Sequence, residues 1–535
     1  IFPENDKITF IDNKNVFESR DQEDFYFENK FPYQFNHYTK LGAKLIADNI
    51  ASAIEDSVKK INQPEAGQSL AEKQELGVDL SCPDCNLIVV SLSNVRKDHL
   101  GLYGYSRDTS PNIDEFFKDS IVFDSTFAPA SWTFTNAVSF LTSLSPYKHG
   151  IMERKKNVNL SKINNIKFLA EILKDNNYKT AAFVSDEDYN RKYGLNRGFD
   201  TFFDKNSYFD YGIKFNPGEY NIGTKQLVGP AVDWMKENYK DKFFLLLQGF
   251  DAHCPYTPNS PYDKKFSSKE SKQDFSECYI TPKVVESIET DSGKKWPLQS
   301  WSSFKEKGDE KKCIKKENVE QMITLYDGEI AQADNNLKDL FETIEDLDLT
   351  KNTIIVFLSE HGELFGENGF FMRVSLSAQG TLNDKIINIP FIMKHPKVDR
   401  AMQIDSLVQL IDLAPTFLQI LGLEGYYGGQ MQGKSIVPVI TKNKEVNEFV
   451  YGGVKRKHSI YDPDEVFLTE FIRDKQWKLL KEIIINSKSQ EQISEFYGLY
   501  NTIKDSEEKE NLYDQNNNIA KQLLNNLNLW VTEQK

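Results

Sequence analysis

Apolar runs of strand length recur along the middle of the chain. The clearest covers residues 87–92, and comparable runs cover residues 180–184, 243–248, 353–358 and 390–394. Nearly continuous apolar runs of this length are typical of strands that are buried on both faces of a sheet. Helix-patterned segments, such as residues 319–344, separate the runs. The alternation predicts an α/β domain whose central sheet is flanked by helices.

The pattern changes towards both ends of the chain. Residues 1–56 hold one apolar stretch (8–11) and one helix-patterned run (41–54), which are too short to bury a core, and residues 57–84 are polar like a linker. The α/β pattern covers residues 85–440, interrupted by a long polar insertion at 257–318. Residues 441–535 predict a smaller α+β subdomain, with strands at 466–472, 477–485 and 496–500 and an amphipathic helix at 519–531.

Composition narrows the class of protein. Of the 535 residues, 39% are hydrophobic and 27% are charged, as in globular domains. The formal net charge of -15 argues against nucleic acid as a partner, because the phosphate backbone is itself anionic. The apolar runs fall well short of the ~20 residues that span a bilayer, so the sequence predicts no membrane span.

The five cysteines leave the redox compartment open. Their odd number implies that at least one thiol has no partner within the chain. Cys82 and Cys85 form either a local disulfide or two plain thiols, and a bond between Cys278 and Cys313 would tie the insertion, which leaves Cys254 over. The chain starts at Ile1, which we interpret as a processed or truncated start, so that an earlier signal peptide remains an open alternative.

A series of ordered motifs points to a family. The motifs, in chain order, are residues 86–105, RDTSPNID (107–114), APASWT (128–133), LTSLSP (141–146), HG (149–150), DAHCPY (251–256), YDGEI (326–330), SEHGE (359–363), DLAPT (412–416) and NL (511–512). Together they resemble the sulfatase branch of the alkaline phosphatase superfamily over about residues 84–530. The resemblance implies a sulfatase-like α/β fold with a smaller C-terminal α+β subdomain.

The resemblance also implies a divalent cation, calcium or magnesium, in the site. Its four ligand positions read Ser93, Asn94, Glu360 and His361 in this chain. A hard cation needs several oxygen ligands, mostly carboxylates, and only Glu360 supplies one here. We therefore expect a cation to bind weakly.

The resemblance places Thr133 at the position of the family's nucleophile. Formylglycine is not expected from threonine, although a threonine hydroxyl can itself act as a nucleophile. The family's arginine in this motif is replaced by Ala137, and two lysines that clamp the anionic ester read Ser185 and Gln379. The expected catalytic residues are Thr133 and His253, and the expected substrate contacts are Arg96, His149 and Gln379.

These departures leave three interpretations open. In the first, the protein is catalytically degenerate and has a binding or assembly role outside the cytoplasm. In the second, it is a metal-dependent hydrolase or transferase that acts on sulfate or phosphate esters through Thr133. In the third, which is compatible with either, the chain is one piece of a larger complex.

The N-terminal block carries a resemblance of its own. Residues 34–43, QFNHYTKLGA, are similar to the last motif of the SGNH esterases, with Gln34 at the position of the family's aspartate. On this interpretation the motif lies near residues 30–56, and residues 1 to about 56 are the end of a domain whose beginning was removed or lies in a protein partner or second chain fragment. The alternative is a strand and helix that pack on the main domain.

Overall fold

The computed structural model divides the chain into two units, Ile1–Gln74 and Glu75–Lys535. It describes residues 77–153, 160–163, 165–205, 207, 223–254, 256–266, 316–371, 373, 378–426, 429–457 and 464–534, and the backbone of six short strands elsewhere. In the first unit these are β1 (Tyr26–Phe27) and β2 (His37–Tyr38), which pair antiparallel. The rest of the predicted N-terminal strand, helix and SGNH-like motif lies outside the described residues.

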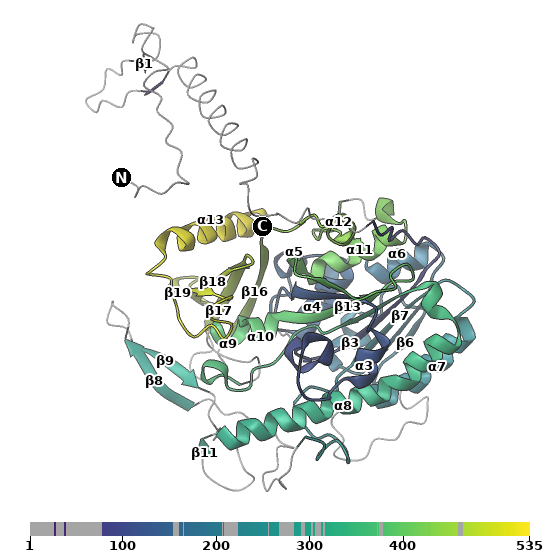
Figure 1. The fold of residues 1–535 in the computed structure, drawn as a ribbon. Coiled ribbons are helices and arrows are strands. Elements are labelled where there is room, and N and C mark those ends of the chain that lie inside the picture. Colours follow the sequence, from purple (N-terminus) through teal and green to yellow (C-terminus); the bar gives the residue numbers. More distant parts are fainter. Residues whose placement is uncertain are drawn as a thin grey trace, which may run out of the picture. The chain divides into compact units, whose positions relative to one another are not determined.

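A nine-stranded sheet forms the centre of the second unit, in the order β14-β4-β13-β12-β3-β7-β5-β6, with β15 also paired to β4 (Figure 1). Its strands are β3 (Asn86–Leu92), β4 (Ile121–Phe127), β5 (Lys179–Val184), β6 (Thr201–Phe203), β7 (Phe243–Gly249), β12 (Thr353–Leu358), β13 (Asn388–Lys394), β14 (Met402–Ile404) and β15 (Val408–Gln409). Strand β13 runs antiparallel to both of its neighbours, whereas the other pairings are parallel.

Helices cover both faces of this sheet (Figure 1). Alternate residues of β3 belong to two different cores, Leu87 and Val89 to one and Ile88 and Val90 to the other. The first face is covered by α4 (Thr133–Thr142), α6 (Leu169–Asp175), α11 (Leu413–Ile420) and α12 (Val437–Lys442). The second is covered by α3 (Pro111–Phe116), α7 (Thr224–Asn238) and α8 (Lys316–Asp346). The predicted α/β architecture is therefore confirmed.

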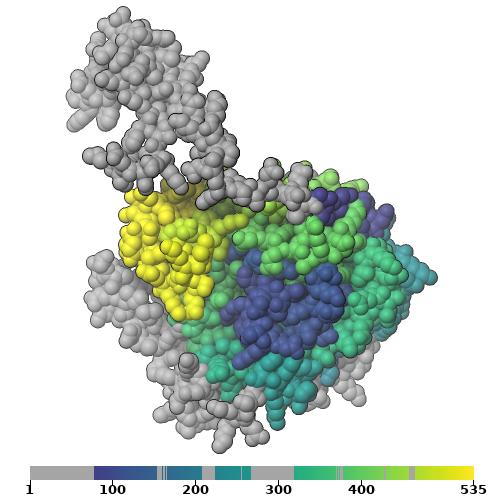
Figure 2. Space-filling view, viewed as in Figure 1, coloured from purple at the N-terminus to yellow at the C-terminus, as the bar shows by residue number. Residues whose placement is uncertain are grey.

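The C-terminal part is an antiparallel sheet with one long helix. The strands are β16 (Val450–Lys457), β17 (Glu465–Arg473), β18 (Trp477–Asn486) and β19 (Gln492–Asn501), and the helix is α13 (Asn517–Gln534). Figure 2 shows these residues, in yellow, against the remainder of the unit. The contact between the C-terminal part and the α/β part includes a polar interaction. Ser145, the N-cap of α5 (Pro146–His149), donates a hydrogen bond across 2.8 Å to Gln534, the last residue of α13.

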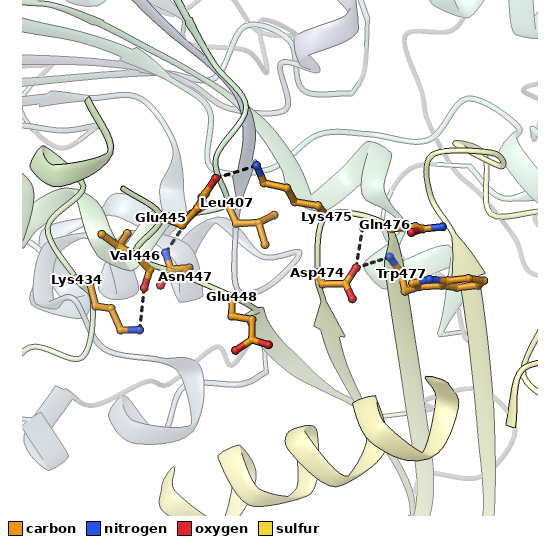
Figure 3. A pocket seen from close by; sticks show the side chains of 10 residues that line it. All are labelled: Leu407, Lys434, Glu445, Val446, Asn447, Glu448, Asp474, Lys475, Gln476 and Trp477. Atoms are coloured by element: carbon orange, nitrogen blue, oxygen red, sulfur yellow. Dashed lines mark hydrogen bonds and ion pairs between the residues drawn. The ribbon is translucent and has the colours of Figure 1, made fainter. Parts of the chain in front are cut away.

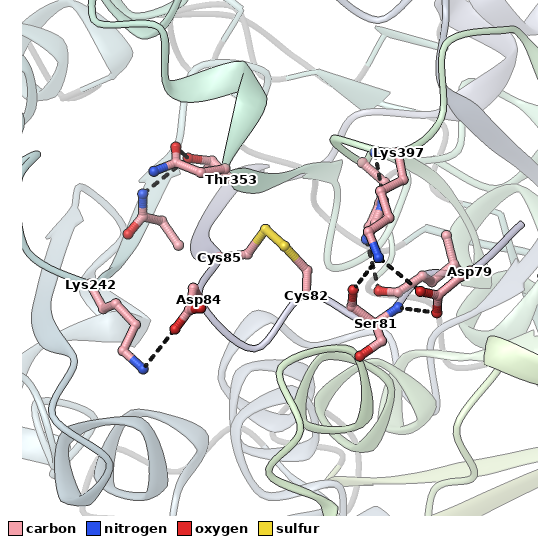
Figure 4. Close-up of a disulfide and its surroundings, with 12 residues drawn as sticks. Asp79, Ser81, Cys82, Asp84, Cys85, Lys242, Thr353 and Lys397 are labelled. Carbon is pink, nitrogen blue, oxygen red and sulfur yellow. Dashed lines mark hydrogen bonds and ion pairs between the residues drawn. A yellow bond between two sulfur atoms is a disulfide. The ribbon is translucent and has the colours of Figure 1, made fainter.

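A disulfide joins Cys82 to Cys85 just before the first central strand (Figure 4). The backbone N–H of Cys82 also donates to the carbonyl of Ile420 at the end of α11, so this turn is fixed to the domain. Cys254 is disulfide-bonded too, and the expectation that it is left over is wrong. The predicted link between Cys278 and Cys313 lies outside the described residues.

The predicted insertion contains secondary structure of its own. Strands β8 (Lys283–Glu289) and β9 (Lys295–Ser300) pair antiparallel, as do β10 (Ser303–Phe304) and β11 (Lys312–Cys313). Within the described parts of the chain, no helix is long and apolar enough to cross a lipid bilayer.

Candidate functional site

The predicted site residues lie where the central strands end. Ser93 and Asn94 follow β3, His253 follows β7, and Glu360 and His361 follow β12. These three strands are parallel neighbours, so their carboxyl ends share one edge of the sheet. Helix α4 begins beside them at Thr133, and the amide of Asn136 on that helix donates to the carbonyl oxygen of Glu360 across 2.7 Å.

Thr133 and His361 form a direct pair. The Oγ1 atom of Thr133 lies 3.0 Å from Nε2 of His361, and Nδ1 of the same ring lies 3.1 Å from the carbonyl oxygen of Gly362. The carbonyl can only accept, so Nδ1 carries the proton and Nε2 accepts from the hydroxyl. Both side chains are buried. The arrangement is that of a nucleophile and a base, enclosed within the protein.

The first expected metal ligand, Ser93, donates instead of offering a free oxygen. Its hydroxyl donates to Oε2 of Glu360 across 3.0 Å and accepts a 2.7 Å hydrogen bond from the amide of Gln248, the penultimate residue of β7. Ser185, which stands at one of the family's lysine positions, donates to the Gln248 carbonyl. This corner of the site is filled by hydrogen bonds within the protein.

The second expected ligand, Asn94, is paired in the same way. Its amide donates to Oε2 of Glu363 across 2.6 Å, and the Tyr256 hydroxyl donates to the same oxygen across 3.2 Å. Asn94 adopts a left-handed backbone with φ +68°, which asparagine tolerates better than most residues. Glu363 is fully buried, so this hydrogen bond of the Asn94 amide lies inside the protein.

A buried arginine, Arg373, joins the site from the segment after β12. Its NH2 atom lies 2.8 Å from Nε2 of His253, and its NH1 atom lies 3.7 Å from Oε2 of Glu363. Nδ1 of His253 lies 2.6 Å from the carbonyl of Cys254, so Nε2 accepts from the guanidinium. The ring of His253 also stacks on Phe250.

The donor set does not fit the family's divalent cation. Of its four expected ligands only Glu360 is a carboxylate, and both Ser93 and Asn94 give hydrogen bonds to carboxylates. Among the residues that the structure describes, no group of three or more His, Cys, Asp or Glu side chains is arranged to hold a metal ion.

Burial controls the charge of the acidic groups. It raises the pKa of both Glu360 and Glu363, and the Arg373 guanidinium opposes the rise at Glu363. Burial also raises the pKa of Asp186 to about 8, helped by the charges of Asp188 and Glu360 and opposed by Arg373. Burial therefore disfavours the charged form of each of these carboxyl groups, and Arg373 offsets part of that effect at Glu363 and Asp186.

The three expected substrate contacts are bonded to other residues than Thr133. Arg96 is buried between Asp98 and Glu367, with bonds of 2.8 and 2.6 Å, and it also donates to the backbone carbonyl of Glu363 across 3.2 Å. Gln379, the first residue of α9 (Gln379–Leu382), donates to the carbonyl of Glu508 across 3.0 Å. His149 lies 2.9 Å from the Ser139 hydroxyl, and burial lowers its pKa to about 3, so its ring is neutral. Their described hydrogen bonds do not connect them to Thr133.

A cavity of about 770 Å³ lies at another place, beside the C-terminal sheet (Figure 3). It is lined by Leu407, Lys434, residues 445–448 and residues 474–477. Lys475 crosses it to form a 2.9 Å ion pair with Glu445. None of its lining residues is an expected site residue, so this cavity is distinct from the surroundings of Thr133.

Sequence reasoning missed Glu363, Arg373 and Gln248. Glu363 lies within the SEHGE motif, and its place three residues after Glu360 is a signal that could have been used. Gln248 interrupts the apolar run of β7 at its carboxyl end, which is also visible in the sequence. Nothing in the sequence around Arg373 indicates that its side chain reaches His253.

Comparisons with known proteins identify the family of the chain. The sulfatase family profile matches residues 85–423, which is more than half of the chain. The chain belongs to the sulfatase family. A second profile, N-sulphoglucosamine sulphohydrolase C-terminal, matches residues 366–533.

Individual sulfatases are distant from this chain. A sulfatase of Formosa agariphila is 23% identical over 412 residues, covering 70% of this chain and 76% of that protein. Arylsulfatase K of Homo sapiens is 26% identical over 224 residues, which cover 39% of this chain and only 38% of that protein. The phosphonate monoester hydrolase of Agrobacterium radiobacter shares the fold, with a TM-score of 0.60 at 16% identity over 84% of this chain and 96% of its own.

Proposed function

We propose that this sulfatase-family chain is catalytically degenerate and acts through binding or assembly. One observation carries the proposal: Ser93 and Asn94, at the family's ligand positions, donate hydrogen bonds to Glu360 and Glu363. In an ester hydrolase the groups at such positions must stabilise charge that develops on the substrate. Here they stabilise the protein's own carboxyl groups.

The experiment is a turnover assay on the purified chain. Aryl sulfates and aryl phosphate monoesters are offered in the presence of calcium and of magnesium, and the chain is compared with Thr133→Val. Thr142→Val is the matched control, because Thr142 lies on the same buried helix and bonds only to that helix's backbone in the described structure. We expect the three proteins to be equally inactive. Turnover that Thr133→Val abolishes and Thr142→Val keeps would overturn the proposal.

A second candidate function is ester hydrolysis or transfer through Thr133. The 3.0 Å contact with His361 favours it, because the imidazole is placed to take the hydroxyl proton. Buried oxygens of Asn94, Glu360 and Glu363 that have no hydrogen-bond partner among the described residues also favour it, since a bound ligand would satisfy them. In the same assay this candidate predicts activity that His361→Ala abolishes.

The proposed location is outside the cytoplasm. Cys82 and Cys85 form a disulfide and Cys254 is also disulfide-bonded, and disulfides persist mainly in oxidising compartments. Fractionation of the source cells, with thiol alkylation before lysis, tests this. Recovery of the chain in the cytosolic fraction with reduced cysteines would contradict it.

A further inference from the structure

Arg373 carries a positive charge into the interior of the site. Its side chain is 6% exposed, and it contacts His253 and Glu363. Its Nε and NH1 atoms have no hydrogen-bond partner among the described residues. Burying a guanidinium is costly unless negative charge compensates it, so its position needs an explanation.

Three acidic side chains that can carry negative charge follow two of the central strands. Glu360 and Glu363 follow β12, and Asp186 follows β5, and all three are at most 6% exposed. Arg373 opposes the effect of burial on the pKa of both Glu363 and Asp186. Nδ1 of His253 donates to the Cys254 carbonyl, and Nε2 accepts from the guanidinium of Arg373. In this arrangement the imidazole adds no second positive charge beside Arg373.

We propose that the guanidinium of Arg373 supplies, beside these buried carboxyl groups, the positive charge that a bound cation would otherwise supply. The inference deepens the proposed function and rests on it, because both take the ligand positions to be unfit for a divalent ion. Ser93 and Asn94 supply hydrogen bonds, and Arg373 supplies charge. In this account a metal and Arg373 are alternatives for the same group of buried carboxyl groups.

The first test needs no variant. The melting temperature of the whole chain is measured in EDTA, in calcium chloride and in magnesium chloride. We expect shifts below about 1 °C, because a ligand stabilises a protein only by binding its folded state. A rise of roughly 5 °C or more in either metal, as expected for an occupied site in large excess of ligand, would overturn the inference.

The second test separates charge compensation from packing. Arg373→Met should lower the melting temperature by roughly 5 °C or more, because it leaves buried carboxyl groups without their cation. Adding Glu363→Gln should restore part of that loss, since glutamine keeps the shape and removes the charge. Additive losses in the double variant would contradict the inference.

Arg456→Met is the matched control for this test. Arg456 is equally buried, 5% by side chain, but pairs with Glu482 in the C-terminal sheet. Glu363→Gln should not restore stability to Arg456→Met, because Glu363 is not its partner. Restoration in both backgrounds would show a general effect of Glu363→Gln and would also overturn the inference.

The outcomes distinguish the two proposals. Ester turnover by a chain whose melting temperature does not change with calcium or magnesium would overturn the proposed function. It would leave the proposed role of Arg373 as a substitute for a bound cation standing. A large metal-induced rise without turnover would overturn the role of Arg373 and leave the proposed function standing.

Discussion

The hydroxyl of Thr133 donates a hydrogen bond to Nε2 of His361, so that the expected nucleophile and an expected metal ligand satisfy each other. The same imidazole nitrogen cannot accept this hydrogen bond and bind a metal at once. The hydroxyl proton of Thr133 is likewise engaged in this hydrogen bond. The same hydrogen bond therefore bears on metal binding by His361 and on nucleophilic action by Thr133. Both can be tested by changing single side chains.

Thr133→Val should lower the free energy of unfolding by about 1 to 3 kcal/mol. The change keeps the shape of the side chain but leaves Nε2 of a fully buried imidazole without this donor. Thr133→Ser keeps the hydroxyl and should cost less. Urea unfolding of the two variants measures the difference, and equal stability of valine and serine variants would show that the hydrogen bond contributes nothing.

Asp186→Asn should remove a loss of stability that develops between about pH 4 and pH 8. The pKa of Asp186 is raised from 3.8 to about 8 in the folded chain, so the folded state holds a proton there that the unfolded state releases above pH 4. Stability then falls as pH rises from about 4 to 8, by at most about 1.4 kcal/mol per pH unit from this group. Asparagine stays neutral and can still accept from the Asp188 N–H.

The measurement for Asp186 is guanidinium-induced unfolding at pH 5 and pH 8. The variant should gain stability relative to the unaltered chain at pH 8 and little at pH 5. Asp233→Asn, an exposed change on α7, should alter neither value. A pH dependence that is the same with aspartate and asparagine at 186 would contradict the prediction.

Lys478→Met should be strongly destabilising, by about 3 to 5 kcal/mol. Lys478 is fully buried, and its ammonium lies 2.7 Å from Glu508 and 3.0 Å from Asp384. Methionine fills the space but leaves two buried carboxyl groups without that charge. Lys509→Met, which changes an exposed lysine next to the same turn, should cost little. Equal effects of the two variants in chemical denaturation would refute this role.

Reduction of the Cys82–Cys85 disulfide should have a modest effect. The closed loop has only three residues of sequence separation, so the chain-entropy gain is at most about 2 kcal/mol. Cys82→Ser with Cys85→Ser should reproduce that loss. A loss well above this size would mean that the turn at Ile420, to which Cys82 is bonded, depends on the disulfide.

The core strands were predictable because a strand buried on both faces appears in the sequence as a nearly continuous apolar run. The runs at 180–184 and 353–358 became β5 and β12 within a residue, and 319–344 became the long helix α8. Strand β4 was not predicted, because Asp124, Ser125 and Thr126 interrupt its apolar pattern near the edge of the sheet. The antiparallel direction of β13 could not be predicted either, since a buried run reads the same in both directions.

The sequence predicted where the site residues lie but not which side chains they bond to. Ordered motifs located Thr133, Ser93, Glu360 and His361, and these residues do lie together. Their bonds depend on side chains that carry no local signal: Gln248 reaches Ser93 from a strand 155 residues away, and Arg373 reaches His253 across 120 residues. Long-range pairing of polar side chains is set by the packing of the sheet and loops, which periodicity does not encode.

Elemental analysis of the purified chain tests the central claim most directly. The chain is incubated with calcium and magnesium, passed through a desalting column, and its metal content is measured per chain. We predict a content far below one ion per chain, because Ser93 and Asn94 donate hydrogen bonds to Glu360 and Glu363 and Arg373 lies beside Glu363. One calcium or magnesium ion per chain, lost when Glu360→Ala and His361→Ala are introduced together, would contradict the account.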